Sequence, residues 1–299
     1  MQIEHPLQVD LLILGAGWTS GFLFPLLRRK GLVYAATTTS GRDETIPFKY
    51  DPSSDDPSPF RRLPSATTVL ITFPLRGKGP SSHLTRLYTE THRDISATTP
   101  RFIQFGSTGI WNTPSWNDSS SPYDETNPRA VAEDELLAVS DAVVLNLAGL
   151  YGGTRQPRNW VDRVAKTKAE LKAKGALHLI HGDDVARAVV AAHENFEKVK
   201  GQRWLLSDLH VYDWWDLVLA WAVDTLQAAE DDSIEDQKSQ TVMARQAELK
   251  DWVVELMHEE GVRALPRDTP LLGRVLDGRG FWEALSLIPM HVLRVPGGR

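Results

Sequence analysis

The stretch LLILGAGWTSGFLF, residues 11–24, decides the fold. The apolar run 9–14 ends at Gly15, which is typical of a buried parallel strand. Residues 19–30 follow with an apolar face and a basic end before Gly31, so they predict a helix. The β-branched and aromatic residues of 32–39 then predict a second strand. This order indicates a βαβ unit that begins with a glycine-rich turn.

The glycine spacing in this turn favours a nucleotide-binding loop over a mere tight turn. Gly15 permits the sharp turn, and Gly17 has no Cβ, so backbone N–H groups can approach a pyrophosphate. Ser20, with Gly21 beside it, is the small residue where the helix crosses the strand, and the helix N-terminus is directed at the phosphates. We expect the cofactor to contact Gly15, Gly17, Trp18, Thr19, Ser20 and Gly21, and Phe73 and Pro74 at the end of the strand 67–74.

The end of the second strand favours NADP over NAD. An NAD-preferring loop generally carries an acidic residue here, which binds the ribose 2′-hydroxyl. This chain has hydroxyl groups and a guanidinium instead, which complement a 2′-phosphate: Thr38, Thr39, Ser40 and Arg42. Asp43 and Glu44 can compete for Arg42. The alternative is an ordinary exposed turn.

Strands and helices keep alternating along the chain. Predicted strands at 67–74, 101–107 and 143–152 alternate with predicted helices at 81–95, 129–140 and 183–196. After about residue 200 the pattern becomes mainly helical. The prediction is an α/β fold with a Rossmann-type doubly wound parallel sheet in residues 1–202. Residues 153–177 cross to a smaller, mainly helical C-terminal substrate lobe at 203–299.

Composition restricts the classes of partner. The 299 residues carry a net charge of −6, which argues against nucleic acid. The absence of cysteine excludes a disulfide or a Cys nucleophile and fits a cytoplasmic protein. The apolar stretch 9–27 is broken by glycines and Pro25, so it predicts no signal peptide or membrane span.

The ten tryptophans indicate core packing or an indole-lined pocket for an apolar or aromatic small-molecule substrate. We expect a monomer or homodimer.

Five motifs in order resemble the short-chain dehydrogenase/reductase superfamily, in its extended and atypical branch of NAD-dependent epimerase/dehydratase-like proteins. The resemblance covers about residues 9–210. It rests on LGAGWTSG (14–21), FIQFGSTGIWN (102–112), YDETNP (123–128), VVLNLAGLYGGTR (143–155) and LHLIHGDDVARAV (177–189). It implies NAD(P) as cofactor and the final ninety residues as the place for a substrate lobe.

The resemblance implies Ser107 as the hydroxyl that binds the substrate oxygen, although capping of the strand end is the alternative. The family's proton-donating Tyr is due at Val131 or Ala132, and its Lys at Glu135 or Leu136, and no Tyr-x-x-x-Lys occurs in the chain. Tyr123 and Tyr151 are the nearest phenols, and Tyr151, at a strand exit, is the better substitute acid, although packing at a domain junction is the alternative.

The sequence HLIHGDD, residues 178–184, combines two His and two Asp. His178 and His181 alternate on a strand, so their spacing does not suit a helical metal pair. Asp183 or Asp184 is well placed to cap the next helix. We therefore expect no metal site.

Three functions remain open. The first is an NADP-dependent oxidoreductase or epimerase-like enzyme with a non-standard proton donor, acting on a small carbonyl or hydroxyl substrate. The second is a non-catalytic NADP-binding sensor or scaffold, which the missing Tyr and Lys favour. The third is non-redox catalysis with the cofactor as a structural part, because fold does not fix function.

Overall fold

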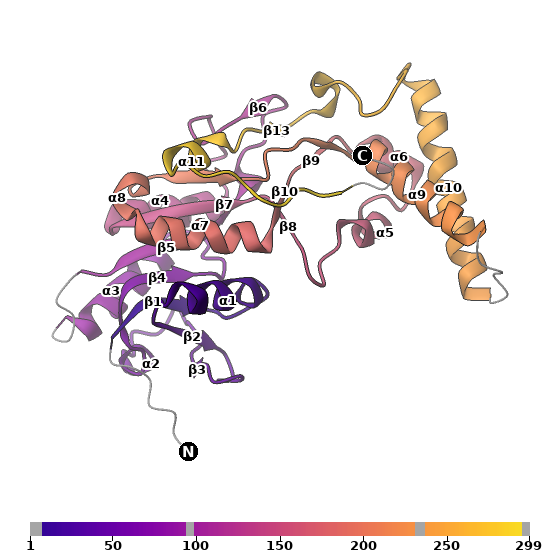
Figure 1. Cartoon of the computed structure of the whole chain (residues 1–299). Helices are drawn as coiled ribbons and strands as arrows, with labels where there is room; N and C mark the ends of the chain where they lie inside the picture. Colours follow the sequence, from indigo (N-terminus) through magenta and orange to yellow (C-terminus); the bar gives the residue numbers. More distant parts are fainter. Residues whose placement is uncertain (1–7, 94–98, 231–236, 295–299) are drawn as a thin grey trace.

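A parallel sheet of seven strands forms the centre of the molecule, in the order β11-β7-β5-β4-β1-β2-β3. The computed structural model describes residues 8–93, 99–230 and 237–294. Figure 1 shows the sheet with its helices. The strand order reverses beside β1, as in a doubly wound sheet, so the predicted Rossmann-type fold is confirmed. The strands are β1 (Gln8–Leu14), β2 (Tyr34–Thr38), β3 (Ile46–Pro47), β4 (Ser65–Ile71), β5 (Arg101–Ser107), β7 (Ala142–Leu147) and β11 (Arg203–Leu206).

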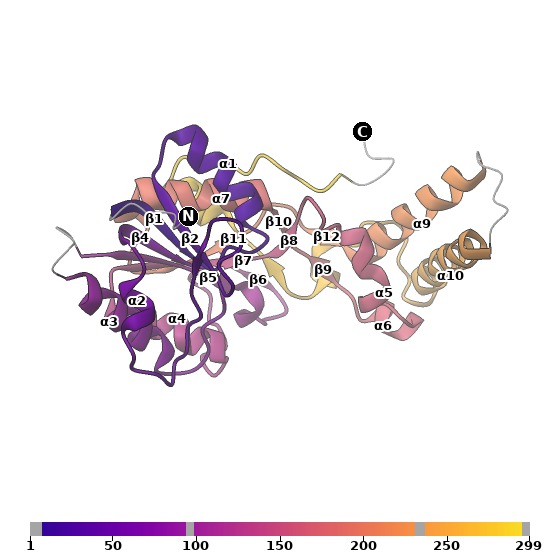
Figure 2. The same cartoon turned by 90° about the horizontal axis from the view of Figure 1, so that it is seen from below.

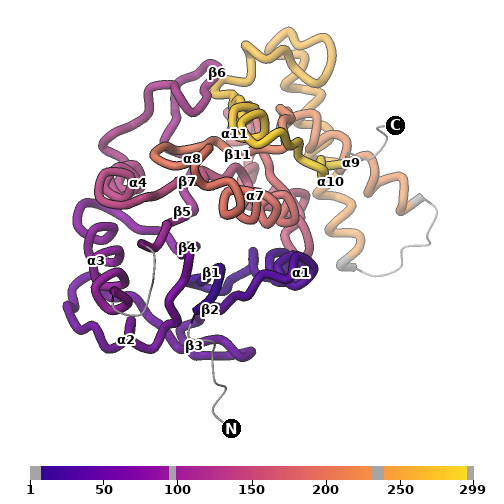
Figure 3. Tube along the Cα trace, turned by 60° about the vertical axis from the view of Figure 1, so that its left-hand side comes forward, coloured from indigo at the N-terminus to yellow at the C-terminus, as the bar shows by residue number. Residues whose placement is uncertain are grey.

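Helices cover both faces of this sheet (Figure 2). On one face α1 (Ser20–Lys30) packs against α7 (Gly182–Glu194), and on the other α3 (Pro80–His92) packs against α4 (Pro128–Val139). The predicted helix 81–95 ends at His92 in α3, and its last residues, 94–95, lie outside the described residues. Figure 3 shows β4, β1 and β2 in succession between the two helical layers.

The alternation of side chains along the strands creates two cores. Leu11 and Ile13 of β1 belong to the core under α1 and α7, whereas Leu12 and Leu14 belong to the core under α3 and α4. All four are buried completely. This explains the continuous apolar run in the sequence, because a strand that is covered on both faces has no polar side.

Short elements connect and extend the main ones. The further helices are α2 (Ser58–Arg61), α5 (Val161–Val164), α6 (Lys168–Lys172), α8 (Phe196–Val199) and α11 (Arg279–Ala284), with 3-10 turns η1 (Thr108–Ile110), η2 (Pro157–Trp160) and η3 (Thr269–Leu272). The further strands are β6 (Trp116–Asn117), β8 (Gly149–Tyr151), β9 (Ala176–Leu177), β10 (Leu179–His181), β12 (Tyr212–Asp213) and β13 (Val275–Leu276).

The second lobe is built around α9 (Trp214–Glu230) and α10 (Gln237–Glu259), which lie together at the end of the molecule away from the sheet (Figure 1). Its core contains Trp214, Trp215 and Trp221 together with residues of the crossing segment. Trp111, Trp215 and Trp282 are fully buried, so packing accounts for much of the tryptophan content.

The chain passes between the two lobes more than once. β11 completes the sheet after the crossing segment, and Phe281 and Trp282 of α11 return to the core beside α7. The predicted boundary between a domain of residues 1–202 and a lobe of residues 203–299 stays a prediction.

Among the described helices, none combines the length and the hydropathy that a membrane span requires.

The start of α7 differs from the sequence expectation. His181 is the N-cap residue, and its Nδ1 accepts the backbone N–H of Asp183 at 3.2 Å. The prediction that Asp183 or Asp184 caps this helix is therefore wrong. Asp184 instead accepts the backbone N–H groups of Met290 and His291, which ties the C-terminal segment to α7.

Candidate functional site

Two cavities meet at Gly15, at the carboxyl end of β1. One has a volume of about 480 Å³ and extends toward the ends of β2 and β4. The other has a volume of about 340 Å³ and extends toward the ends of β5 and β7. Ligands of doubly wound sheets bind at such a place, outside the strand ends where the strand order reverses.

The backbone conformation and the close neighbours of position 15 require a glycine there. Its φ of +97° is unfavourable for residues with a side chain, and a Cβ there would lie 2.6 Å from Oγ1 of Thr72. That hydroxyl donates to the carbonyl oxygen of Gly15 at 2.6 Å, and the N–H of Gly15 donates to Oγ1 of Thr37 at 3.0 Å. The turn is therefore fixed from both neighbouring strands.

The turn between β1 and α1 places two backbone donors at the second cavity. Gly17 lines this cavity, and a Cβ built on it would have no atom within 4 Å among the described residues. The backbone N–H groups of Trp18 and Thr19 have no acceptor within the described part of the chain. These two groups lie just before α1, whose positive dipole end also suits a phosphate.

The other two loop residues lie outside both cavities. Ser20 is buried, as the third small position of the loop requires, whereas Gly21 is exposed on the outer side of α1. Neither lines a cavity. Cofactor contacts of Ser20 and Gly21 remain a prediction that this geometry does not support.

The first cavity has a mainly apolar lining, with hydroxyls and cations at its edge. Phe73 and Pro74 line it as expected, and the rings of Phe73 and Tyr50 are stacked at 6.0 Å. Thr38 and Thr39 line it too, together with Lys49 and Arg76, which the sequence did not single out. Such a lining suits a flat apolar ring attached to an anionic group.

Ser40 and Arg42 lie in the exposed turn beyond β2 and line neither cavity. The Arg42 side chain is exposed, and its Nε is 3.9 Å from Oδ2 of Asp43. Oγ1 of Thr38 closes this turn by accepting the N–H groups of Gly41 and Arg42. Binding of a 2′-phosphate by Ser40 and Arg42 stays a prediction, and Lys49 is an additional candidate.

Ser107 lines the second cavity, between Gly17 of the loop and Arg129 at the start of α4. Its hydroxyl oxygen accepts the N–H of Gly109 at 3.2 Å, so it caps the short turn η1. The hydroxyl proton stays available to a ligand. The two roles left open by the sequence are therefore compatible at this residue.

A buried polar network holds the end of β5 below Ser107. Nδ2 of Asn146 donates to the carbonyl oxygen of Ser107 at 3.1 Å and to Glu133 at 2.8 Å. A Cβ at Gly106 would lie 2.4 Å from Nδ2 of Asn146, so only glycine fits there. Burial raises the pKa of Glu133, while Asn146 and Arg203 lower it.

The structure does not bring Tyr151 into either cavity. Leu150 lines the second cavity, and Tyr151, on the opposite side of β8, is 6% exposed and packs in the core of the second lobe. Its hydroxyl has no partner among the described residues. Burial raises its pKa, and the nearby Asp208 and Asp184 act in the same direction. A role as proton donor stays a prediction without geometric support.

The positions where the family has Tyr and Lys carry no substitute. Val131 is half-buried, Ala132 and Leu136 are fully buried apolar residues, and Glu135 accepts backbone N–H groups of Gly79 and Ser81. Arg129, one turn before Ala132, is the polar side chain of α4 that lines the second cavity. Its Nη2 donates to the carbonyl oxygen of Phe105 at 2.6 Å, and burial lowers its pKa.

The two cavities favour anions. Their described lining residues include Lys49, Arg76, Arg129 and Arg155 and no carboxylate. None of these four cations is among the site residues expected from the sequence. Arg129 could have been found, because it occupies the cavity-facing start of the predicted helix 129–140. Lys49, Arg76 and Arg155 lie in irregular segments, where sequence spacing does not indicate direction.

Comparisons with known proteins support the fold. No family model matches the chain, and no curated protein matches it. Among solved structures, yeast methylglyoxal/isovaleraldehyde reductase Gre2 complexed with NADPH is 16% identical, with a TM-score of 0.54 over 95% of this chain and 94% of that one. Human epimerase family protein SDR39U1 with NADPH is 13% identical, with a TM-score of 0.53 over 94% and 95%. MoeE5 in complex with UDP-glucose and NAD is 14% identical, with a TM-score of 0.55 over 95% and 94%.

Two of these structural neighbours are an epimerase family protein and a reductase, and all three match almost the whole chain. The resemblance predicted from the five motifs is thus confirmed at the level of the fold. The structural match also covers the second lobe, whereas the five motifs end at about residue 210.

Proposed function

We propose that the chain binds NADP(H) in the two joined cavities and acts as an atypical short-chain dehydrogenase/reductase on a small carbonyl or hydroxyl substrate. The observation that supports this most strongly is the pair of N–H groups of Trp18 and Thr19, next to Gly17, that have no acceptor among the described residues. They lie in a crevice whose described lining holds cations and no carboxylate. The solved neighbours with NADPH or NAD support a nicotinamide dinucleotide. The cytoplasm remains the expected location.

Each part of the crevice has a proposed role. The slot beside Tyr50 and Phe73 receives the adenine, and the amides of Trp18 and Thr19 bind the pyrophosphate. Thr38, Thr39 and Lys49, with Arg42 after a turn of its side chain, bind the 2′-phosphate. The nicotinamide end then lies beside Ser107.

The cofactor supplies or accepts the hydride. The Ser107 hydroxyl donates to the substrate oxygen, because its own oxygen is held by the N–H of Gly109. Arg129 stabilises the negative charge that develops on this oxygen, in place of the missing Tyr and Lys. Water delivers the proton to this oxygen when a carbonyl is reduced and accepts it when a hydroxyl is oxidised. Tyr151 is not required in this scheme.

One observation favours the alternative of a non-catalytic NADP-binding sensor or scaffold. The position of the usual Tyr is taken by Val131 or Ala132 and that of its Lys by Glu135 or Leu136, so neither supplies a phenol or an amine. Such a protein would bind the cofactor and turn over no substrate.

A panel of small aldehydes and ketones, followed through NADPH absorbance, distinguishes the two. The enzyme hypothesis expects turnover that falls by one to three orders of magnitude in Ser107→Ala and in Arg129→Met. NADPH binding without turnover of any panel member supports the sensor. Turnover unchanged by both substitutions would remove these residues from the proposal.

A further inference from the structure

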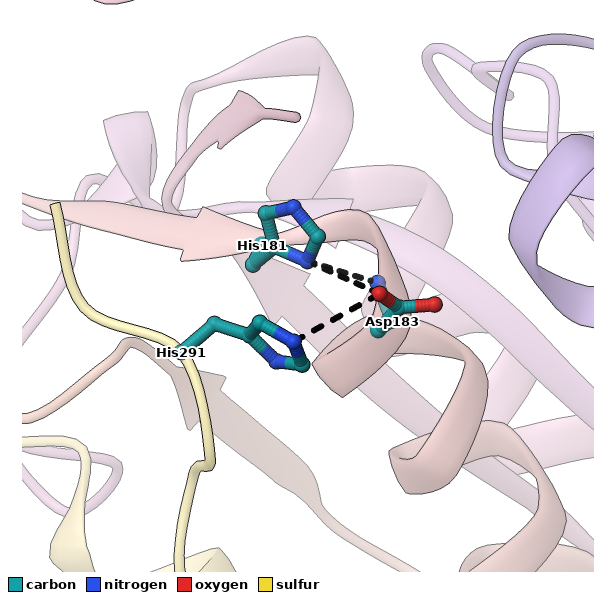
Figure 4. Close-up of side chains that lie close together, drawn as sticks. All are labelled: His181, Asp183 and His291. Atoms are coloured by element: carbon teal, nitrogen blue, oxygen red, sulfur yellow. Dashed lines mark hydrogen bonds and ion pairs between the residues drawn. The ribbon is translucent and has the colours of Figure 1, made fainter. Parts of the chain in front are cut away.

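A second cluster of polar side chains lies where α7 meets the C-terminal segment (Figure 4). His181 and Asp183 come from the junction of β10 and α7, and His291 comes from the segment after α11. One donor atom from each residue lies within 4.8 Å of the other two. None of the three lines the proposed cofactor crevice.

We propose that His181, Asp183 and His291 bind a divalent transition-metal ion such as zinc(II), with water as the fourth ligand. Tetrahedral zinc takes imidazole nitrogen and carboxylate oxygen at about 2.0–2.2 Å, which places neighbouring donors roughly 3.4 Å apart. Here Nδ1 of His181 is 3.4 Å from Oδ2 of Asp183, and Nε2 of His291 is 3.6 Å from the same oxygen. Two of the three separations thus suit the ion.

Asp184 orients the imidazole ring of His291 for metal binding. This carboxylate is 0% exposed, and its Oδ2 lies 3.2 Å from Nδ1 of His291. It also accepts the backbone N–H groups of Met290 and His291, which hold the segment in place. A histidine that donates Nδ1–H to a carboxylate presents the lone pair of Nε2, which is the usual arrangement around a ligating histidine.

The ion requires a small local rearrangement. The rings of His181 and His291 are stacked at 4.3 Å, so their lone pairs do not yet converge. His181 is confined, because a Cβ at Gly152 would lie 2.3 Å from its Nε2 and the Tyr151 ring packs on it at 5.0 Å. The His291 side chain is 42% exposed and turns more readily.

The metal also replaces one weak hydrogen bond. Nδ1 of His181 accepts the N–H of Asp183 at 3.2 Å, and coordination takes over that lone pair. The carboxylate of Asp183 is 45% exposed, so an ion reaches the cluster directly from solvent.

The proposed zinc site revises the sequence-based expectation of no metal site, which considered only His178, His181, Asp183 and Asp184. His291 was not part of that pattern because it is distant in sequence.

Zinc titration of the tag-free, EDTA-treated full-length chain by calorimetry tests the proposal. It predicts one zinc per chain. His291→Ala and Asp183→Asn weaken binding at least tenfold, and Asp184→Asn weakens it roughly 10- to 100-fold with all three ligands present. His258→Ala, at an exposed histidine near the end of α10, binds zinc as the wild type does.

Circular dichroism confirms that each variant is folded, and His291→Ala changes only a half-exposed side chain. Cobalt(II) in place of zinc reports coordination through its visible absorption. Absence of saturable binding would overturn the proposal, as would affinity unchanged in both His291→Ala and Asp183→Asn. The result is independent of NADPH binding, which these variants leave unchanged.

Discussion

The guanidinium of Arg155 lies over the indole ring of Trp18, 4.5 Å from its centre, at the wall of the second cavity. A cation held against an aromatic face beside a helix N-terminus places positive charge where the pyrophosphate is proposed to bind. No ion pair joins Arg155 to a carboxylate among the described residues, and the residue lines the second cavity, so its charge can act on a ligand.

Replacing Arg155 should therefore weaken cofactor binding. We expect Arg155→Ala to raise the Kd for NADPH about tenfold, which corresponds to the loss of one charge-assisted hydrogen bond of about 1.4 kcal/mol. Tryptophan emission follows the titration. The control is Arg163→Ala in α5, an exposed arginine outside both cavities. Equal affinity in both variants would exclude Arg155 from the site.

The cation that recognises the 2′-phosphate can be identified by comparing two coenzymes. We expect NADPH to bind the wild type more tightly than NADH. Lys49→Ala and Arg42→Ala should reduce the affinity for NADPH and leave that for NADH nearly unchanged, because NADH lacks the 2′-phosphate. Lys49 already lines the cavity, so its effect should be the larger. Equal affinities of the wild type for both coenzymes would contradict the NADP assignment.

Two glycines of the loop should respond oppositely to alanine. Gly15→Ala places a Cβ 2.6 Å from Thr72 Oγ1 at a φ of +97°, so we expect it to lower the free energy of unfolding by about 1–3 kcal/mol. Gly21→Ala meets no atom within 4 Å inside α1, so we expect a gain of up to about 1 kcal/mol. Urea unfolding measures both. Similar stability of the two variants would disprove the strain argument.

Asp208 should make stability depend on pH. Burial raises its pKa to about 6, although its carboxylate accepts the Tyr212 hydroxyl at 2.6 Å. The pKa of Asp208 in the folded protein exceeds its unfolded value of 3.8. The stability that protonated Asp208 contributes to the free energy of unfolding is therefore present at low pH and is lost as the pH rises through 6.

Asp208→Asn removes this titration. Relative to the wild type, its free energy of unfolding should rise between pH 4 and pH 7 by at most about 3 kcal/mol. Denaturant unfolding of both proteins across this range provides the measurement. A difference that is constant with pH would show that Asp208 stays ionised in the fold.

The sequence predicted the sheet well because the signals for its strands are local. The run 9–14, the glycine turn and the strand 101–107 each carry their own apolar pattern, and they appear as β1, its turn and β5. Gly15, Gly17, Trp18, Thr19 and Ser107 could be placed beside one cavity from the loop and strand-end motifs alone.

The remaining site residues depend on directions that a linear pattern does not contain. Tyr151 and Leu150 are adjacent on β8, and which of them faces the cavity is decided by the packing of the second lobe. Arg155 and Lys49 lie in loops without periodicity. His291 is distant in sequence and meets His181 because Asp184, Arg187 and Tyr212 hold the C-terminal segment in place.

Calorimetric titration of NADPH into the wild type and Gly17→Val tests the central claim most directly. A valine at Gly17 has room, since no atom lies within 4 Å of its Cβ among the described residues, so the fold should persist. We predict one NADPH per wild-type chain and at least a hundredfold loss in Gly17→Val, because the side chain fills the phosphate approach. Failure of the wild type to bind NADPH, or normal binding by folded Gly17→Val, would contradict the account.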